Sequence, residues 1–197
     1  MSRIGSCQRQ TKETSIDVTV DLDGTGRTDA LTGLPFFDHM LDQLGRHGGF
    51  DIVVKAVGDL AVDAHHTVED TGIALGKAFA QALGDKAGVR RFASVRVPLD
   101  EALVEAVIDL SGRPYLHWEV SFPEGNTIHG TPPYDAQLTE EFFRALITAA
   151  AMTLHVTSVR GKNTHHLVEA SFKATARALR DAVRVEGTEV PSTKGAL

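Results

Sequence analysis

Cysteine is almost absent from this chain, because Cys7 is the only one among 197 residues. A single cysteine excludes an internal disulfide and zinc sites built from several thiolates, and it fits a reducing compartment. The chain also lacks any apolar run near the roughly 18 residues of a membrane span, and residues 1–6 have no apolar signal core. These absences predict a cytoplasmic protein without a membrane partner.

An excess of positive charge is missing as well. The 20 Lys and Arg residues are outnumbered by 26 Asp and Glu, which gives a formal net charge of −6 at pH 7. A nucleic-acid partner is therefore not expected, because binding to backbone phosphates needs a basic surface. The chain is nevertheless long enough to bury a hydrophobic core.

What the chain has instead is one short pattern that occurs twice. The strings HHTVE at residues 65–69 and HHLVE at residues 165–169 share the pattern HHxxE. Imidazole and carboxylate groups are common ligands of zinc, manganese and iron in proteins. The doubled HHxxE therefore predicts a metal site, and the shared glutamate offset argues against a chance surface placement of these histidines.

The sequence around these strings repeats in a similar order. Residues 15–22 alternate apolar and polar side chains, meet a turn signal at residues 23–26 and resume to Leu31, which predicts a β-hairpin. A helix from residue 139 is expected to carry Met152 and to end near His155. The other expected elements are a helix at 36–44, strands at 50–57, 92–98, 102–110 and 115–122, and two HHxxE helices, from 66 to 83 and from 165 to about 185.

This order predicts an α+β fold made of two internally duplicated, β-rich α/β half-domains, at about residues 8–90 and 91–187. Units of roughly 100 residues bury little surface alone, so we expect them to pack as one domain spanning residues 1–197, with helices on one side of each sheet. His47 and His155 are expected at equivalent places, near the ends of the two helices that carry a double Phe.

Helix geometry limits how the histidines can share metal ions. In each string either histidine can face one point together with the glutamate, whereas the two adjacent histidines diverge by about 100°. Each doublet is therefore expected to split between two ions, with open coordination positions left for chemistry. The expected ligands are His47, His65, His66, Glu69, His155, His165, His166 and Glu169. Which histidine of a doublet serves which ion stays open.

Together with other motifs, these strings make the chain resemble the imidazoleglycerol-phosphate dehydratase family almost from end to end. Each short motif is weak alone, but the ordered set is specific. The motifs are TKET at 11–14, DLDGTG at 21–26, FFDHML at 36–41, both HHxxE strings, DLSGRP at 109–114 and PSTKG at 191–195.

The resemblance implies ribosomal-protein-S5-domain-2-like halves, two Mn²⁺ per active site, and a homo-oligomeric shell of twenty-four subunits whose neighbouring chains complete each site. It also implies dehydration of imidazole glycerol phosphate to imidazole acetol phosphate, a step of histidine biosynthesis. The split doublets indicate two ions independently. The choice of manganese and the assembly follow from the resemblance alone.

The chemical difficulty of this reaction is a carbon-bound proton that is not acidic. If the imidazole ring of the substrate bridges two ions, its electrons can expel the adjacent hydroxyl and so acidify the next C–H, which a carboxylate can remove. The resemblance assigns this general base to Glu13. The sequence leaves open whether Asp38 and Asp100 orient site histidines or are solvated acids.

The phosphate of such a substrate needs cations and N–H donors. The resemblance makes residues 188–197 a tail that closes on this phosphate. It also makes His39 and Gln43, four residues apart on one helical face, substrate contacts, with packing or capping as the alternative role. The phosphate-end residues that it implies are Arg91, Arg113, Lys173, Ser192 and Lys194.

Two other classes of protein remain open at this stage. Paired ions with His and Glu ligands also serve a dinuclear-metal hydrolase acting on a small phosphorylated substrate, although the HExxH string of zinc proteases is absent. A metal-storage protein is the second alternative. Its four-helix plan carries Glu-x-x-His, whereas this chain has His-x-x-Glu and interposed strands.

Overall fold

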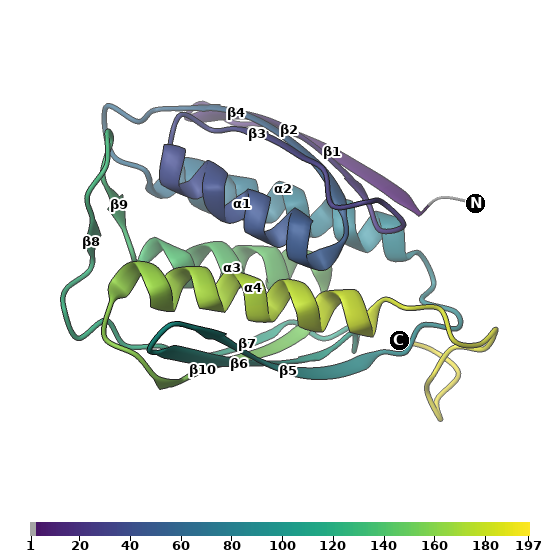
Figure 1. Cartoon of the computed structure of the whole chain (residues 1–197). Coiled ribbons are helices and arrows are strands. Elements are labelled where there is room, and N and C mark those ends of the chain that lie inside the picture. The colour runs from purple at the N-terminus through teal and green to yellow at the C-terminus, as the bar shows by residue number, and fades with distance from the viewer. Residues whose placement is uncertain (1–2) are drawn as a thin grey trace.

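Two four-stranded β-sheets form the outer layers of the molecule, and four helices lie between them (Figure 1). The structure, a computed structural model, describes residues 3–197. Met1 and Ser2, which belong to the N-terminal stretch without a signal core, lie outside the described residues. The arrangement confirms the predicted α+β fold with two similar halves and helices on one side of each sheet.

The first sheet has the strand order β1-β2-β4-β3 and is covered by α1 and α2. In β2 every second side chain is buried, as in Ile16, Val18 and Val20, which is the pattern of a strand with one face on the core. The elements of this half are β1 (Ile4–Gln10), β2 (Thr14–Asp21), β3 (Thr28–Leu31), α1 (Pro35–Gly48), β4 (Asp51–Gly58) and α2 (His65–Leu83).

The second sheet has the order β5-β6-β10-β7 and is covered by α3 and α4, while β8 and β9 form a short separate ribbon. The elements of this half are β5 (Phe92–Leu99), β6 (Ala102–Asp109), β7 (Tyr115–Glu119), β8 (Thr127–Ile128), β9 (Tyr134–Asp135), α3 (Leu138–Ala150), β10 (Thr153–Arg160) and α4 (Thr164–Ala182). Among the described residues, no helix combines the length and apolar character that crossing a bilayer requires.

Strand register shows which residues of the two halves correspond. Asp21 of β2 pairs with Asp51 of β4, and Asp109 of β6 pairs with Thr153 of β10. A shift of 88 residues (Asp21 to Asp109) therefore relates β2 to β6, and a shift of 102 (Asp51 to Thr153) relates β4 to β10. The residues with a left-handed backbone that cap α1 and α3, Gly49 and Ala151, are also 102 positions apart. Helix α1 packs on α4 and α2 packs on α3, as this correspondence requires.

The predicted hairpin between residues 15–22 and the strand that ends at Leu31 is wrong. Strand β2 pairs with β1 and β4, whereas β3 pairs in parallel with β4. The hairpin partner of β2 is β1, an edge strand in which Gly5 is the one fully buried residue. Because β1 has little apolar alternation, its sequence does not show the pattern of a half-buried strand.

The predicted equivalence of His47 and His155 is also wrong. Helix α3 ends before His155, which lies in β10 between β6 and β7. The shift of 102 residues matches His155 to Val53 and His47 to Ala149. Met152 is apolar and buried, so the apolar pattern of α3 continues past the last residue of the helix. This pattern is the reason why the sequence predicts a longer helix.

Helices α2 and α3 approach each other closely where α2 carries glycine. A Cβ built on Gly76 would lie 2.3 Å from the backbone oxygen of Leu146. Gly76→Ala should therefore destabilise the protein by about 1–3 kcal/mol, because a packed helix backbone cannot move aside as a flexible side chain can. Thermal and urea melts measure this loss. Gly187→Ala is the control, since a Cβ there would meet no atom within 4 Å, and equal melts for the two variants would contradict the prediction.

Candidate metal centre

Three ligand-type side chains from two helices converge between α1 and α4. The metal-binding atoms of His39, His165 and Glu169, here called the α1/α4 cluster, all lie within 4.8 Å of one another. Glu169 Oε2 is 3.0 Å from His165 Nε2 and 3.3 Å from His39 Nε2. Two imidazole nitrogens and a carboxylate oxygen suit manganese, iron or zinc. The cluster therefore fits part of the coordination shell of a divalent metal ion.

Glu169 is ready to bind a cation because it is held in its charged form. Its side chain is 11% exposed, and Lys173 Nζ lies 2.5 Å from its Oε1. Burial opposes ionisation of Glu169, but hydrogen bonds from Lys173 and His165 outweigh it and lower the pKa of this carboxyl. In this chain Lys173, which was predicted to contact phosphate, thus contacts a candidate metal ligand.

Polar side chains of α1 extend from this cluster along the helix. Gln43 Nε2 lies 3.4 Å from His39 Nδ1, and Gln43 Oε1 lies 3.2 Å from His47 Nε2. Burial lowers the pKa of His47, and the charges of Lys173 and Arg177 lower it further. His47 is therefore a neutral imidazole that contacts Gln43 rather than the α1/α4 cluster.

A related group lies between α2 and α3. His65 Nε2 is 3.6 Å from Glu69 Oε2, and Glu69 lines one cavity of about 410 Å³ together with Glu141 of α3. The shift of 102 residues matches Glu141 to His39. We call His65, Glu69 and Glu141 the α2/α3 group. Sequence reasoning missed Glu141, because only the alignment of α1 with α3 reveals it.

The two groups differ in their electrostatic surroundings. Ile73 stands four residues after Glu69, at the place that Lys173 has after Glu169. The side chain of Glu69 is 44% exposed, compared with 11% for Glu169. The carboxylate of the α1/α4 cluster is thus buried and neutralised by a cation, whereas that of the α2/α3 group is open to solvent.

The second histidine of each doublet faces different surroundings from the first. The two rings are nearly perpendicular in both doublets, at 87° and 86°. His66 Nδ1 lies 3.0 Å from Asp59 Oδ2, and His166 Nδ1 lies 2.7 Å from Glu101 Oε2. The hydrogen bond with Asp59 raises the pKa of His66. Backbone N–H donation from Asn163, then the contact with His166, lowers the pKa of Glu101 to about 2.

Glu13 lies at the turn between β1 and β2, beside the first HHxxE string. Its backbone N–H donates to Thr11 Oγ1, and its Oε2 lies 4.0 Å from His66 Nδ1. The side chain is 54% exposed, and the carboxylate accepts no hydrogen bond from the residues that the structure describes. Glu13 is therefore an accessible carboxylate close to a candidate metal ligand.

The structure gives different places to the two acids whose roles the sequence left open. Asp38 accepts hydrogen bonds from the backbone N–H and the hydroxyl of Thr32, so it fixes the loop before α1. Burial raises the pKa of Asp38 despite these bonds. Asp100 Oδ2 lies 3.8 Å from Nε2 of His166, whereas Glu101 contacts Nδ1 of the same ring.

His155 lies away from both groups. Its side chain is exposed, while its neighbours in β10, Leu154 and Val156, are buried toward the helices. The ring of His155 contacts His117 and Tyr115, at centroid distances of 5.3 and 5.6 Å. The second sheet therefore separates His155 from the metal-ligand candidates of its own chain.

Four of the five predicted phosphate residues, all except Lys173, lie in or near the C-terminal tail. Arg91 donates to Asp109 Oδ1 at 2.7 Å and to the carbonyl oxygen of Pro191 at 2.7 Å. A guanidinium nitrogen of Arg113 lies 4.0 Å from Asp109 Oδ2. The tail continues through Ser192, whose hydroxyl accepts the backbone N–H of Lys194. We call Arg91, Asp109, Arg113 and residues 191–194 the tail cluster.

The two HHxxE strings and the tail cluster lie at opposite ends of the molecule. Helix α4 starts beside the loop before β8, because Thr164 donates to the carbonyl of Gly125, and His65 of α2 shares a cavity with residues of β8 and β9. At the other end, Arg91 N–H donates to the carbonyl of Ala182, the last residue of α4. The 19 residues of α4 span about 28 Å at 1.5 Å per residue.

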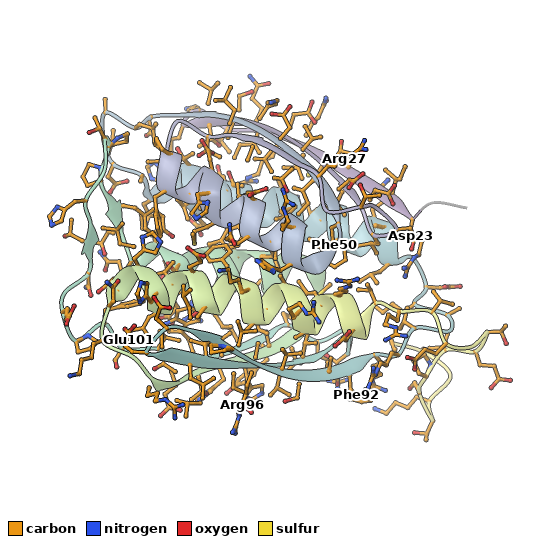
Figure 2. The ribbon with its side chains drawn as sticks, viewed as in Figure 1. Asp23, Arg27, Phe50, Phe92, Arg96 and Glu101 are labelled. Carbon is orange, nitrogen blue, oxygen red and sulfur yellow. The ribbon has the colours of Figure 1, made fainter. Side chains whose placement is uncertain are left out.

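Figures 1 and 2 show this separation directly. Glu101, the partner of His166, lies near the start of α4, and Phe92, the neighbour of Arg91, lies near its end (Figure 2). The C-terminal tail leaves the molecule at the end opposite to β8 and β9 (Figure 1). A single chain thus places its HHxxE side chains and its cationic tail cluster farther apart than a small phosphorylated substrate can reach.

Comparison with known proteins gives a consistent result over the whole chain. The family model of imidazoleglycerol-phosphate dehydratase matches residues 32–179. The imidazoleglycerol-phosphate dehydratase of Parafrankia sp. (strain EAN1pec) is 54% identical over 200 residues, covering 100% of both chains. The protein of that name from Paracoccus denitrificans (strain Pd 1222) is 57% identical over 193 residues, with 96% of each chain covered.

Solved structures show the same likeness in three dimensions. The crystal structure of imidazoleglycerol-phosphate dehydratase from Staphylococcus aureus subsp. aureus N315 superposes with a TM-score of 0.81 at 36% identity, covering 92% of this chain and 99% of the other. The structure of the Pyrococcus furiosus protein gives 0.83 at 35% identity, with 96% and 99% covered. The chain therefore belongs to the imidazoleglycerol-phosphate dehydratase family.

Proposed function

We propose that this chain carries out the dehydration of its family, from imidazole glycerol phosphate to imidazole acetol phosphate in histidine biosynthesis, at a centre that holds two Mn²⁺. Family membership supports the reaction. The observation that carries the metal dependence is the convergence of His39, His165 and Glu169 within 4.8 Å. The pair of manganese ions, the general base, the phosphate clamp and the shared sites are the parts that need testing.

The proposed ligands follow the two groups of side chains. His39 joins the predicted set because it shares Glu169 Oε2 with His165. Glu141 joins it as the counterpart of His39 beside Glu69. The metal-binding roles of His47 and His155 stay predictions. His47 contacts Gln43 and His155 contacts His117, and neither contacts the α1/α4 cluster or the α2/α3 group of its own chain. Bound ions would polarise the substrate's azole ring and stabilise the negative charge that develops on it.

Glu13 is the proposed general base. Its carboxylate is exposed, lies 4.0 Å from His66, and has no donor among the described residues, so a lone pair is available for the carbon-bound proton. The proton is transferred to one Oε atom, and the C–H bonding electrons form the carbon–carbon double bond of an enol that tautomerises to the ketone. The hydroxyl that the ring electrons expel leaves with a proton as water. Removal of this proton is the step that a correctly placed carboxylate accelerates most.

The tail cluster is the proposed phosphate site. Asp109 holds the guanidinium of Arg91, while Arg113 has a side chain that is 67% exposed and able to bind an anion. Ser192 and Lys194 lie in the same tail, and closure of residues 188–197 over the phosphate is part of the proposal. The phosphate role of Lys173 stays a prediction, because this side chain contacts Glu169.

Sharing of sites between subunits is supported by the separation along α4. Metal ligands at its start and Arg91 at its end are about 28 Å apart, so one active site would combine the first from one chain with the second from another. The shell of twenty-four subunits, a cytoplasmic location, and the division into repeats at 8–90 and 91–187 within one catalytic domain also belong to the proposal.

Metal removal provides the direct test. Treatment with a chelator should lower turnover of imidazole glycerol phosphate at least about 100-fold, because the preorganised charge that stabilises the reacting ring is lost. Added Mn²⁺ should restore it. Formation of imidazole acetol phosphate is measured alongside release of free phosphate. Phosphate release instead of the ketone would favour the hydrolase alternative, and bound metal without either product would favour storage.

A further inference from the structure

The two halves carry a glutamate in equivalent turns, just before the second strand of each β-hairpin. The shift of 88 residues that relates β2 to β6 matches Glu13 to Glu101. Each of these glutamates lies beside the second histidine of an HHxxE string. Glu13 Oε2 is 4.0 Å from His66 Nδ1, whereas Glu101 Oε2 is 2.7 Å from His166 Nδ1. Equivalent residues thus make contacts of different strength.

A third acid explains the difference. In the first half, Asp59 follows β4 directly and accepts from His66 Nδ1, with oxygens at 3.0 and 3.2 Å. In the second half, β10 is followed by Gly161, Lys162 and Asn163, so no acid is available there. Glu101 takes the place of Asp59 at the imidazole, and the backbone N–H groups of Lys162 and Asn163 donate to its other oxygen at 3.1 and 2.9 Å.

A carboxylate at Nδ1 has a definite effect on an imidazole. It accepts a hydrogen bond from Nδ1–H, which fixes the ring orientation and leaves the Nε2 lone pair free for a metal ion. Asp59 meets this condition at His66 and Glu101 meets it at His166. Glu13 does not, because its nearest oxygen is 4.0 Å away while Asp59 already accepts the hydrogen bond from Nδ1–H.

We propose that Asp59 and Glu101 are matched positioning residues that present Nε2 of His66 and His166 to metal, and that Asp59 thereby leaves Glu13 free for proton transfer. The inference rests on the proposed function, since it takes these imidazoles to be metal ligands. It assigns different work to Glu13 and Glu101, although they occupy equivalent turns. Both oxygens of Glu101 already accept hydrogen bonds, from two backbone N–H groups and from His166, so Glu101 is assigned to positioning His166 and not to proton transfer.

Manganese binding measures the positioning role without any turnover. The electron paramagnetic resonance signal of free Mn²⁺ is followed while metal-depleted protein is titrated. Glu101→Ala and Asp59→Ala should each weaken binding about 10- to 100-fold, as loss of an outer-shell partner does elsewhere. Glu101→Gln should weaken it less, because its single amide oxygen can still accept a hydrogen bond from Nδ1–H, although the backbone N–H groups of Lys162 and Asn163 then lose their acceptor. Thermal melts identify any variant that fails to fold.

The matched control is Glu105→Gln. Glu105 accepts a hydrogen bond from Arg96 at 2.7 Å on the sheet surface, so its substitution removes the same charge and a comparable bond at a residue whose ion pair involves neither doublet. This variant should bind Mn²⁺ like the wild type. Unchanged binding by folded Glu101→Ala, with normal binding by the wild type, would overturn the positioning role alone. A wild type that binds no Mn²⁺ would overturn the metal centre itself.

Rescue by metal separates positioning from proton transfer. Glu101→Ala should regain most of its kcat at saturating Mn²⁺, whereas Glu13→Gln should bind Mn²⁺ normally and stay inactive at any concentration. If Glu101→Ala binds Mn²⁺ normally yet stays inactive, Glu101 takes part in proton transfer, and the proposed division of work is wrong. If Mn²⁺ rescues Glu13→Gln instead, Glu13 is the positioning residue.

Discussion

Glu13→Gln is expected to lower kcat by about 10²–10⁴-fold, the usual contribution of a general base, while metal binding and assembly stay intact. The amide has nearly the same shape as the carboxylate but cannot accept a proton from carbon. Because the Glu13 side chain is 54% exposed and accepts no hydrogen bond from the described residues, the substitution disturbs little else. The loss should therefore appear in turnover and not in stability.

Steady-state assays of imidazole acetol phosphate formation measure this loss, and metal analysis of the same preparation shows that the centre is filled. Glu105→Gln again serves as the control, since it removes an equal charge without touching the proposed site. Full activity of Glu13→Gln with bound metal would remove this residue from the mechanism. Equal losses in metal content and turnover would make Glu13 a residue of the metal centre.

Two defective chains are expected to restore each other's activity when they assemble together. Glu13→Gln impairs the end of the molecule that carries His66, and Arg113→Ala impairs the tail cluster at the other end. Loss of charge-assisted bonds to phosphate should cost Arg113→Ala about 10- to 100-fold in kcat/KM. If an active site combines opposite ends of two chains, equal mixing leaves up to about a quarter of sites intact.

Joint refolding or co-expression with two distinguishable tags produces the mixed assembly, and assays at low substrate concentration report the recovered kcat/KM. The control is a chain that carries both substitutions. Every site in an assembly of such chains lacks both Glu13 and Arg113, whichever chains contribute to it. The composition of the mixed assemblies is verified first. If they are then no more active than Arg113→Ala alone, each chain holds a complete site. That outcome would reject the proposed sharing.

Local elements of the fold were predictable from the sequence. Helix α2 was expected over residues 66–83 and begins at His65, because apolar periodicity and Gly84 define it locally. Strand pairing was less accessible. The sequence predicted a hairpin ending at Leu31, but the strand that ends there, β3, pairs in parallel with β4. Local alternation identifies a strand and its buried face but does not identify its neighbour in the sheet.

The candidate site was likewise predictable where it depends on local spacing, and not where it depends on contacts between elements. The doubled HHxxE located two ligand helices, since residues three or four apart share a helical face. His39 was expected to contact substrate, yet it lies 3.3 Å from Glu169 because α1 packs on α4. Glu141 escaped notice because the residues around it do not resemble those around His39, and only the aligned helices match the two positions.

The sequence by itself determined the four helices, two of which carry the HHxxE strings, the strands β2 to β7 and the family, because these depend on patterns within short segments and on ordered motifs. Only the tertiary structure decided which distant residues meet: His39 with Glu169, Glu101 with His166, and Arg91 with the end of α4. The tertiary structure also placed the HHxxE side chains and the tail cluster at opposite ends of one chain. Contacts between elements arise from the packing of whole faces, and no local spacing encodes them.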